Sequence, residues 1–382
     1  MLKRIQTGYA LGNVMGDVQV VVQNTYFLLF LTQVIRLDPS SCGILLVLGR
    51  LIDCVSGFVA GFIVDRFAPC SDFIDRRKFW HLIGCILIAM SLPLHLIPPP
   101  NHDVENVDTV KTMLFYIVSW TLCSIGYALS YISHLTVASI LATNDTDSVL
   151  LQSLKNAVSK ITFVVMNLIA TFLISVEEKE ENETTSSTTN AIDWSNRHLF
   201  MHLGLAGSLA SLLLASGFHF FIKSNDLRGV RAIVRELKSM NKNKTFVSGL
   251  KWFKRLPFYS FIIFYSLTWA VYLSLMSYQS FYMQITLAVD RRFVSLVPLI
   301  QNGVGFGISF GMKPLAKKIG KMALYIIGCC FMLIVSVFIA IGPETMGSKD
   351  AIVYILAIGA GIGQSVTLIQ AFVSNFLLFF RC

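Results

Sequence analysis

The stretch from Pro39 to Val64 reads PSSCGILLVLGRLIDCVSGFVAGFIV, and it decides the class of fold. A helix needs about 20 mostly apolar residues to cross a bilayer, and this run is long enough. Two charges lie inside it, Arg50 and Asp53. A charge at the centre of a membrane helix costs about 2.5–3.5 kcal/mol on insertion scales. Such groups persist where they meet partners or water, so they point to a solute or ion pathway.

Composition extends this interpretation to the whole chain. Of the 382 residues, 54% are hydrophobic and 14% are charged, and the mean hydropathy is +0.66. Ordinary soluble domains carry about 25% charged residues. We therefore predict an all-α, multi-pass integral membrane protein. The sequence does not favour an enzyme, because its hydrophilic loops show no Ser-His-Asp set, metal cluster or phosphate loop.

Ten segments qualify as membrane spans by length and apolar content. They are Gly8 to Ile35, Pro39 to Val64, Phe79 to Ile97, Thr112 to Leu141, Leu151 to Ser175, Leu199 to Ile222, Pro257 to Leu287, Phe293 to Leu315, Met322 to Ile341 and Ala351 to Phe380. With the N-terminus in the cytoplasm, most of the 31 Lys and Arg residues fall in cytoplasmic loops. That bias is what the positive-inside rule predicts.

The loops suggest how the chain is divided. A basic stretch separates the sixth and seventh spans, which predicts an N-terminal six-helix bundle over 1–222, a cytoplasmic linker over 223–256 and a C-terminal bundle of four helices over 257–382. The acidic, Ser/Thr-rich loop from Val176 to His198 lies on the opposite side and carries the sequon Asn182-Glu183-Thr184. We therefore expect glycosylation at Asn182.

Cysteine spacing argues against metal and cofactor chemistry. No two of the eight cysteines share a hydrophilic loop at metal-ligand spacing. We expect no metal, no cofactor and no disulfide framework. Nucleic acid is not an expected partner, because the basic linker lies too close to a bilayer; anionic lipid is the expected neighbour of its basic face.

Polar residues form three stripes at helical spacing inside the spans. Asn13, Asp17 and Asn24 lie at i, i+4 and i+11 on the first span, and Asn156, Lys160 and Asn167 repeat this spacing on the fifth. Arg50, Asp53, Cys54, Gly57 and Gly61 form the stripe of the second span. One interpretation is a set of ion pairs that hold the bundle together. The other is a substrate and coupling site near the bilayer midplane, formed by Asp17, Arg50, Asp53, Lys160, Asn13 and Asn24.

A loop motif adds a family resemblance. Gly61-Phe-Ile-Val-Asp65-Arg66 is followed by Asp75-Arg76-Arg77-Lys78. This pattern resembles the cytoplasmic motif of the major facilitator superfamily, and a degenerate copy begins at Gly311. The resemblance implies that superfamily's fold of two helical bundles, with ten of an expected twelve transmembrane helices present. It also implies gating contacts at Gly61, Asp65, Arg66, Arg76, Arg77 and Lys78.

Within the superfamily, Gly16-Asp17 and Arg50-x-x-Asp53 resemble the glycoside-pentoside-hexuronide:cation symporters. The run KFWHLIG at 78–84 and ISHL at 132–135 are similar to lysosomal and melanosomal cysteine transporters. What this implies is import of cysteine or a related small solute into a lysosome-related organelle by alternating access. A zwitterion would need a cation for its carboxylate, Arg50 or Lys160, and an anion for its ammonium, Asp17 or Asp53.

Two departures from the pattern leave alternatives open. The sugar:cation symporters carry a second aspartate where this chain has Gly57, which favours proton coupling or exchange over a sodium site. The C-terminal bundle is expected to be shorter than the six spans of the family. The alternatives are a sugar or lysolipid:cation symporter and, from another class, a truncated regulatory membrane protein that does not transport.

Overall fold

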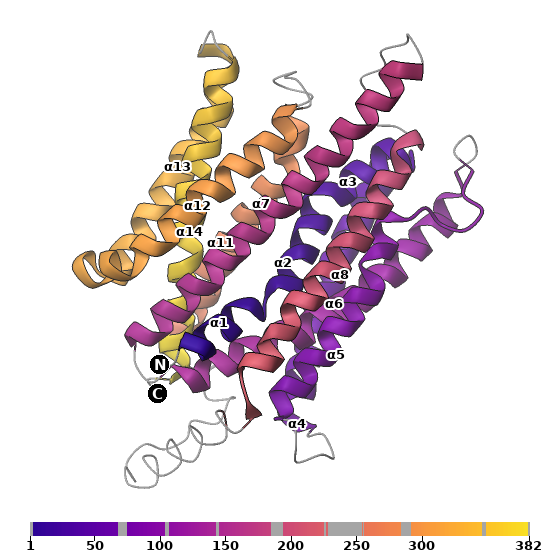
Figure 1. Cartoon of the computed structure of the whole chain (residues 1–382). Coiled ribbons are helices and arrows are strands. Elements are labelled where there is room, and N and C mark those ends of the chain that lie inside the picture. Colours follow the sequence, from indigo (N-terminus) through magenta and orange to yellow (C-terminus); the bar gives the residue numbers. More distant parts are fainter. Residues whose placement is uncertain are drawn as a thin grey trace, which may run out of the picture. The chain divides into compact units, whose positions relative to one another are not determined.

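The computed structural model describes residues 3–67, 75–103, 107–142, 145–184, 194–224, 227, 254, 256–283, 292–345 and 349–380, and helices form most of them (Figure 1). Among these residues, seven helical stretches are long and apolar enough to cross a membrane. Shorter apolar stretches, Ile262–Leu275, Leu296–Met312 and Val353–Ile369, lie within further helices. The prediction of a multi-pass helical membrane protein is confirmed, and the count of ten spans stays a prediction.

The first span is a broken helix. Its segments are α1 (Lys3–Leu11), α2 (Val14–Val21), η1 (Val22–Tyr26), α3 (Phe27–Leu29) and η2 (Phe30–Val34). A turn at Gly12 and Asn13 separates α1 from α2, and η1 and η2 are π-helical. Because a π-turn adds a residue to the helical repeat, the predicted stripe does not continue unchanged from Asp17 to Asn24. π-turns inside α-helices occur frequently at functional sites.

The second and third spans have clear start signals. In α4 (Pro39–Arg66), Asp38 caps the first turn by accepting a 2.9 Å hydrogen bond from the Ser41 amide, and Pro39 occupies the first helical position. In α5 (Arg76–Ser91), Asp75 accepts from the Arg77 amide at 3.0 Å. The short 3₁₀ segment η3 (Pro93–Leu96) completes the third span.

Two long helices follow, α6 (Thr109–Leu141) and α7 (Asp145–Thr184). The predicted loop from Val176 begins too early, because α7 continues to Thr184. Glu and Lys are good helix formers, so the charged stretch extends the helix beyond the apolar span. The backbone of Asn182 therefore lies in the last turn of α7. After η4 (Trp194–Asn196), α8 (Arg197–Phe221) forms the sixth predicted span.

The C-terminal part contains α11 (Leu256–Phe281), α12 (Arg292–Ile319), α13 (Lys321–Thr345) and α14 (Lys349–Phe380). Gly320 separates α12 from α13 and has a φ of +93°, a conformation that favours glycine. Most of the predicted linker 223–256 lies outside the described residues.

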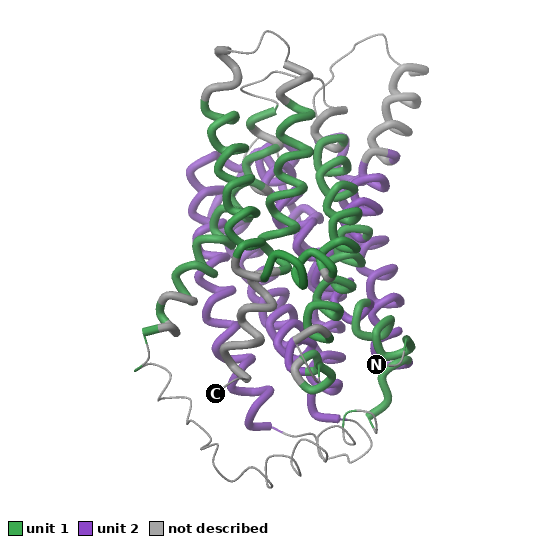
Figure 2. The backbone as a smooth tube through the Cα atoms, turned by 90° about the vertical axis from the view of Figure 1, so that its left-hand side faces the viewer, with its two compact units in different colours: residues 1–10, 137–161, 221–382 green, residues 11–136, 162–220 purple. Residues whose placement is uncertain are grey.

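The chain divides into two compact units (Figure 2). Unit 1 contains residues 1–10, 137–161 and 221–382, and unit 2 contains 11–136 and 162–220. Helices α6 and α7 contribute residues to both. The bundles predicted at 1–222 and 257–382 stay a prediction.

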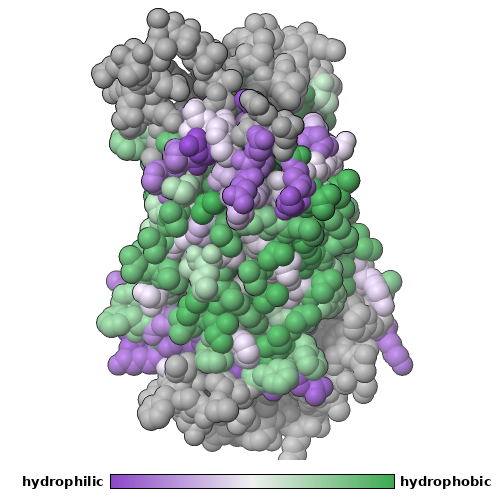
Figure 3. All heavy atoms as spheres, turned by 90° about the vertical axis from the view of Figure 1, so that its right-hand side faces the viewer, coloured by the Kyte–Doolittle hydropathy of each residue, from purple (hydrophilic) through white to green (hydrophobic). Residues whose placement is uncertain are grey.

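Unit 2 combines close helix contacts with an apolar outer surface. The backbones of α5 and α6 approach at Gly84 and Gly126, where a Cβ on Gly84 would lie 2.5 Å from the Gly126 carbonyl oxygen. Small residues commonly permit such contacts between membrane helices. Large apolar side chains such as Phe58 and Phe62 of α4 are exposed. The face in Figure 3 shows a largely hydrophobic band that is bordered by hydrophilic side chains. Such a surface suits contact with lipid.

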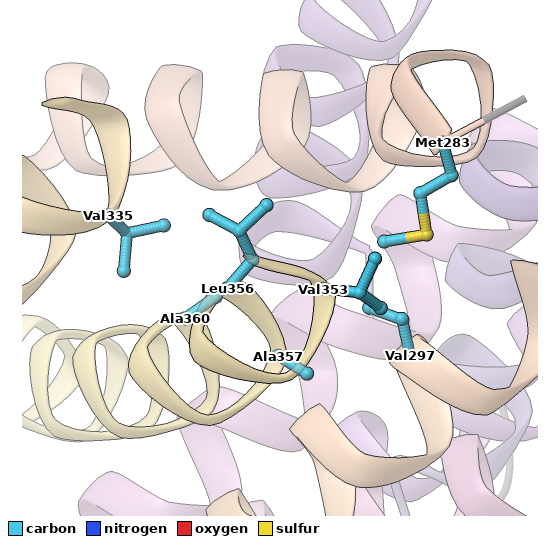
Figure 4. Packing of buried hydrophobic residues seen from close by; sticks show 7 residues of the cluster. All are labelled: Met283, Val297, Val335, Val353, Leu356, Ala357 and Ala360. Carbon is cyan, nitrogen blue, oxygen red and sulfur yellow. The ribbon is translucent and has the colours of Figure 1, made fainter. Parts of the chain in front are cut away.

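In unit 1, α14 packs against α12 and α13. A core cluster joins Val353 and Leu356 of α14 to Val335 of α13 and Val297 of α12 (Figure 4). Met283 fills the space beside Val353 and Val297. This core holds the helices that carry the polar residues of unit 1.

Candidate functional site

Arg50 and Asp53 form an ion pair in the middle of α4. One helical turn separates them, and Arg50 Nη1 lies 3.2 Å from Asp53 Oδ2. Their side chains remain 37% and 33% exposed, respectively. The predicted pair is therefore present, and it is accessible rather than sealed in the packing of unit 2.

The Asp53 carboxylate is fixed by donors from α6. Its Oδ1 accepts a 3.1 Å hydrogen bond from the Trp120 indole Nε1 and another from the Ser124 hydroxyl. Hydrogen bonds to a charged group contribute about 1.5–3 kcal/mol each. Arg50 donates to Oδ2, so both oxygens of this carboxylate have donors and its orientation is fixed.

Arg50 is fixed from the first span. Its Nη2 donates a 2.5 Å hydrogen bond to Asn24 Oδ1 in the π-helical segment η1. The guanidinium carbon also lies 5.6 Å from the centre of the Trp120 ring, a cation–π distance. Asn24 in turn donates to the Val20 carbonyl at 2.8 Å. The site thus joins the first, second and fourth spans.

The other predicted residues of unit 2 lie along the first span and on α7. Asn13 Nδ2 donates to Asp17 Oδ1 at 2.7 Å, and Asp17 is 6% exposed. Asn167 Oδ1 accepts a 2.8 Å hydrogen bond from the Tyr26 hydroxyl. Asn13 and Asp17 of the first predicted stripe are therefore in direct contact, whereas Asn24 is hydrogen-bonded to Arg50.

Lys160 belongs to unit 1, where it forms a second polar cluster. Its Nζ donates a 3.1 Å hydrogen bond to Asn302 Oδ1 of α12, and the lysine is 2% exposed. One turn earlier on α7, Asn156 Nδ2 donates to Ser309 Oγ at 2.7 Å. The predicted stripe of α7 thus divides, with Asn156 and Lys160 in unit 1 and Asn167 in unit 2.

The predicted gating residues lie in the last turns of α4 and the first turn of α5. Arg76 Nη1 donates to the Asp65 carbonyl oxygen at 2.8 Å, which links the two helix ends. Lys78 is 7% exposed and donates to the His219 carbonyl of α8 at 3.1 Å. Asp65 and Arg66 are exposed, and a Cβ added at Gly61 would lie 4.0 Å from Ile132 Cδ1. The motif therefore contacts backbone carbonyls of unit 2.

Sequence reasoning missed the neutral partners of the charges. Trp120 and Ser124 lie one turn apart on α6, in a span without an internal charge to single them out. Asn302 and Ser309 lie on the glycine-rich α12, which likewise has no charge in its middle. These partners could have been sought among polar and indole side chains that lie at the same depth in the membrane as a charged residue of another span.

An accessible pair of opposite charges inside a span of a multi-pass helical protein indicates a pathway for a solute or ion. Comparison with known proteins defines it further. Residues 8–377 match the family described as MFS/sugar transport protein, and the chain belongs to that family. It is a secondary transporter of the major facilitator superfamily.

Curated relatives and solved structures agree with this assignment. Major facilitator superfamily domain-containing protein 12 of Homo sapiens is 26% identical over 373 residues, covering 95% of this chain and 75% of the relative. The Mus musculus protein of that name is 25% identical over 374 residues, with the same coverage.

The proton:xylose symporter XylE, bound to 6-bromo-6-deoxy-D-glucose, has a similar fold with a TM-score of 0.63 at 16% identity, over 99% of this chain and 86% of its own. A bacterial homologue of the iron transporter ferroportin gives a TM-score of 0.57 at 13% identity, over 99% and 85%. At these identities the structures support the fold alone.

Proposed function

We propose that this transporter moves cysteine or a related small amino acid into a lysosome-related organelle by alternating access. The resemblance at 78–84 and 132–135 supports the solute and the membrane. The chemistry of the site supports a zwitterion, because the polar clusters offer both a carboxylate and a cation within spans. In this proposal Asp17 or Asp53 receives the ammonium group of the solute, and Arg50 or Lys160 receives its carboxylate.

The observation that carries the proposal is the exposure of the Arg50–Asp53 pair. Both side chains are held by neutral partners, yet about a third of each remains accessible. A pair that served only to hold helices together would gain most from being closed off, since water weakens the attraction between its charges. An oriented but accessible pair is ready to exchange one interaction for a solute.

The proposal extends to coupling and gating. Gly57 lies one turn beyond Asp53, where a second carboxylate would be needed for a paired sodium site, so we propose a proton as the coupling ion. The Arg76 hydrogen bond to the Asp65 carbonyl is the proposed gating contact between the ends of α4 and α5. Its breakage would let the ends of α4 and α5 separate.

Uptake by the purified chain in proteoliposomes tests this function. Radiolabelled cysteine, kept reduced so that it remains a thiol, should accumulate with the wild-type chain. Asp53→Asn should lower uptake by about ten- to a hundredfold, since bonds to a charged group contribute about 1.5–3 kcal/mol. Asp108→Asn is the matched control, because Asp108 is an exposed carboxylate at the start of α6 whose partner is Lys111.

Three results would redirect the proposal. Uptake by Asp53→Asn at the wild-type rate would remove Asp53 from the site. Stronger competition by sugars or lysolipids than by amino acids would favour those substrates. No uptake of any solute by well-folded, correctly inserted protein would favour a regulatory role.

A further inference from the structure

Unit 1 contains hydrogen-bond donors that its described residues leave without a partner. Three of them lie on two neighbouring helices: Gln301 Nε2 of α12, and Gln364 Nε2 and Ser365 Oγ of α14. All three residues are buried, at 4%, 3% and 0% exposed. A buried donor without a partner costs about 1–3 kcal/mol, so each such group calls for an explanation.

The packing places Ser365 beside Lys160. Both lie against Gly305 of α12, and a Cβ at this glycine would meet the Ser365 hydroxyl and lie 3.0 Å from Lys160 Cε. Any side chain at position 305 would separate α7, α12 and α14. Gly305 therefore allows the Ser365 hydroxyl of α14 and the aliphatic part of the Lys160 side chain of α7 to lie close together.

Gln301 belongs to the same contact, one helical turn before Gly305. Its backbone carbonyl is 2.5 Å from where a Cβ on Gly361 would lie, and Gly361 is one turn before Ser365. The two helices thus meet through two glycines in successive turns. Gln301 and Ser365 belong to this contact between α12 and α14, and Gln301 is the chain neighbour of Asn302, which accepts the 3.1 Å hydrogen bond from Lys160.

The chemistry of the cluster selects one kind of ligand. The unpartnered atoms are N–H and O–H donors, and the neighbouring charge is an ammonium. A group that satisfies them must accept several hydrogen bonds and is best negatively charged. A carboxylate meets both requirements, whereas an ammonium or thiol would meet neither.

On this geometry we infer that the α7–α12–α14 cluster binds the carboxylate of the transported solute, with Lys160 as the cation and Ser365 and Gln301 as hydrogen-bond donors. The inference rests on the proposed function and decides a point it left open. It assigns the solute's carboxylate to the cluster of unit 1. Ser365 and Gln301 become determinants of specificity.

Ligand binding to the purified, full chain tests the inference separately from transport. The probes are 3-mercaptopropionate, which has a carboxylate and no amine, and cysteamine, which has an amine and no carboxylate. The dependence of the melting temperature on ligand concentration gives the apparent Kd. Ser365→Ala and Gln301→Glu should each weaken 3-mercaptopropionate binding about tenfold and leave cysteamine binding unchanged.

Ser336→Ala is the matched control, because the Ser336 hydroxyl is already bonded to the Met332 carbonyl at 2.9 Å. It should change neither Kd. Equal weakening of both probes, or no change with either variant, would overturn the inference. If wild-type protein binds 3-mercaptopropionate but takes up no cysteine, the proposed function fails and the carboxylate site stands. If either variant lowers the melting temperature without ligand, the other provides the comparison.

Discussion

Asn24 accepts a 2.5 Å hydrogen bond at its Oδ1 from Arg50 Nη2, and this contact links the π-helical turn of the first span to the charged pair of α4. The π-turn changes the direction of the side chain, so Asn24 leaves the stripe of Asp17 and meets Arg50. We expect Asn24→Leu, which keeps the shape and removes the acceptor, to lower cysteine uptake by about tenfold. The reason is the loss of one hydrogen bond to a charged group.

Thr32→Val is the control for this prediction. Thr32 lies on the same span, but its hydroxyl bonds the Leu28 carbonyl of its own helix at 2.9 Å. Uptake in proteoliposomes at equal protein content is the measurement. Equal uptake by Asn24→Leu and the wild type would show that Arg50 does not need this partner.

The charged centre of the site could be predicted because charge is conspicuous in apolar sequence. Arg50 and Asp53 stand three residues apart in a long apolar run, and helical spacing alone brings them together. Asn24 and Arg50 were both named, but the contact between them was not predicted, because a π-turn leaves no spacing signal. Trp120 and Ser124 come from a span without charge, so only the packing of α4 on α6 reveals them as partners of Asp53.

Close packing of α5 on α6 provides a prediction about stability. A Cβ at Gly84 would lie 2.5 Å from the Gly126 carbonyl oxygen and from the Ser130 amide nitrogen. These are backbone atoms, which cannot move aside as a side chain can. Gly84→Ala should therefore destabilise the protein by about 1–3 kcal/mol, the usual cost of overpacking. The melting temperature in detergent is the measurement.

Gly57→Ala is the control, since no described atom lies within 4 Å of the Cβ that it would add. It makes the same chemical change in α4 and should leave the melting temperature close to that of the wild type. Equal melting temperatures for the two alanine variants would contradict the close backbone contact between α5 and α6 at Gly84.

His81 holds the break in the first span. Its Nε2 lies 2.8 Å from the Gly12 carbonyl oxygen, which can only accept, so Nε2 carries the proton. Its Nδ1 lies 3.1 Å from His219 Nε2 of α8. His81→Phe keeps an aromatic ring but leaves both groups without this partner. We expect a loss of stability of about 1–3 kcal/mol, measured as a lower melting temperature.

His202→Phe is a suitable comparison, because His202 lies exposed on α8. It makes the same substitution without a buried partner and should have little effect. A larger loss of stability in His202→Phe than in His81→Phe would refute the role given to His81.

The cap of α4 provides a prediction of pH dependence. Asp38 is exposed and precedes the membrane span, and its hydrogen bond from the Ser41 amide holds the pKa of the carboxyl below its ordinary value of 3.8. A lowered folded-state pKa means that the charged form stabilises the fold. This contribution is present above the unfolded-state pKa and is lost as the pH falls through the folded-state pKa.

Asp38→Asn keeps a capping oxygen but cannot titrate. We therefore expect the wild type to be more stable than Asp38→Asn near pH 6, with the difference in melting temperature shrinking toward pH 3. Asp108→Asn should behave in the same way, because the pKa of Asp108 is also lowered, mainly by Lys111. A difference that stays constant from pH 6 to pH 3 would show that the Asp38 charge does not contribute to the cap.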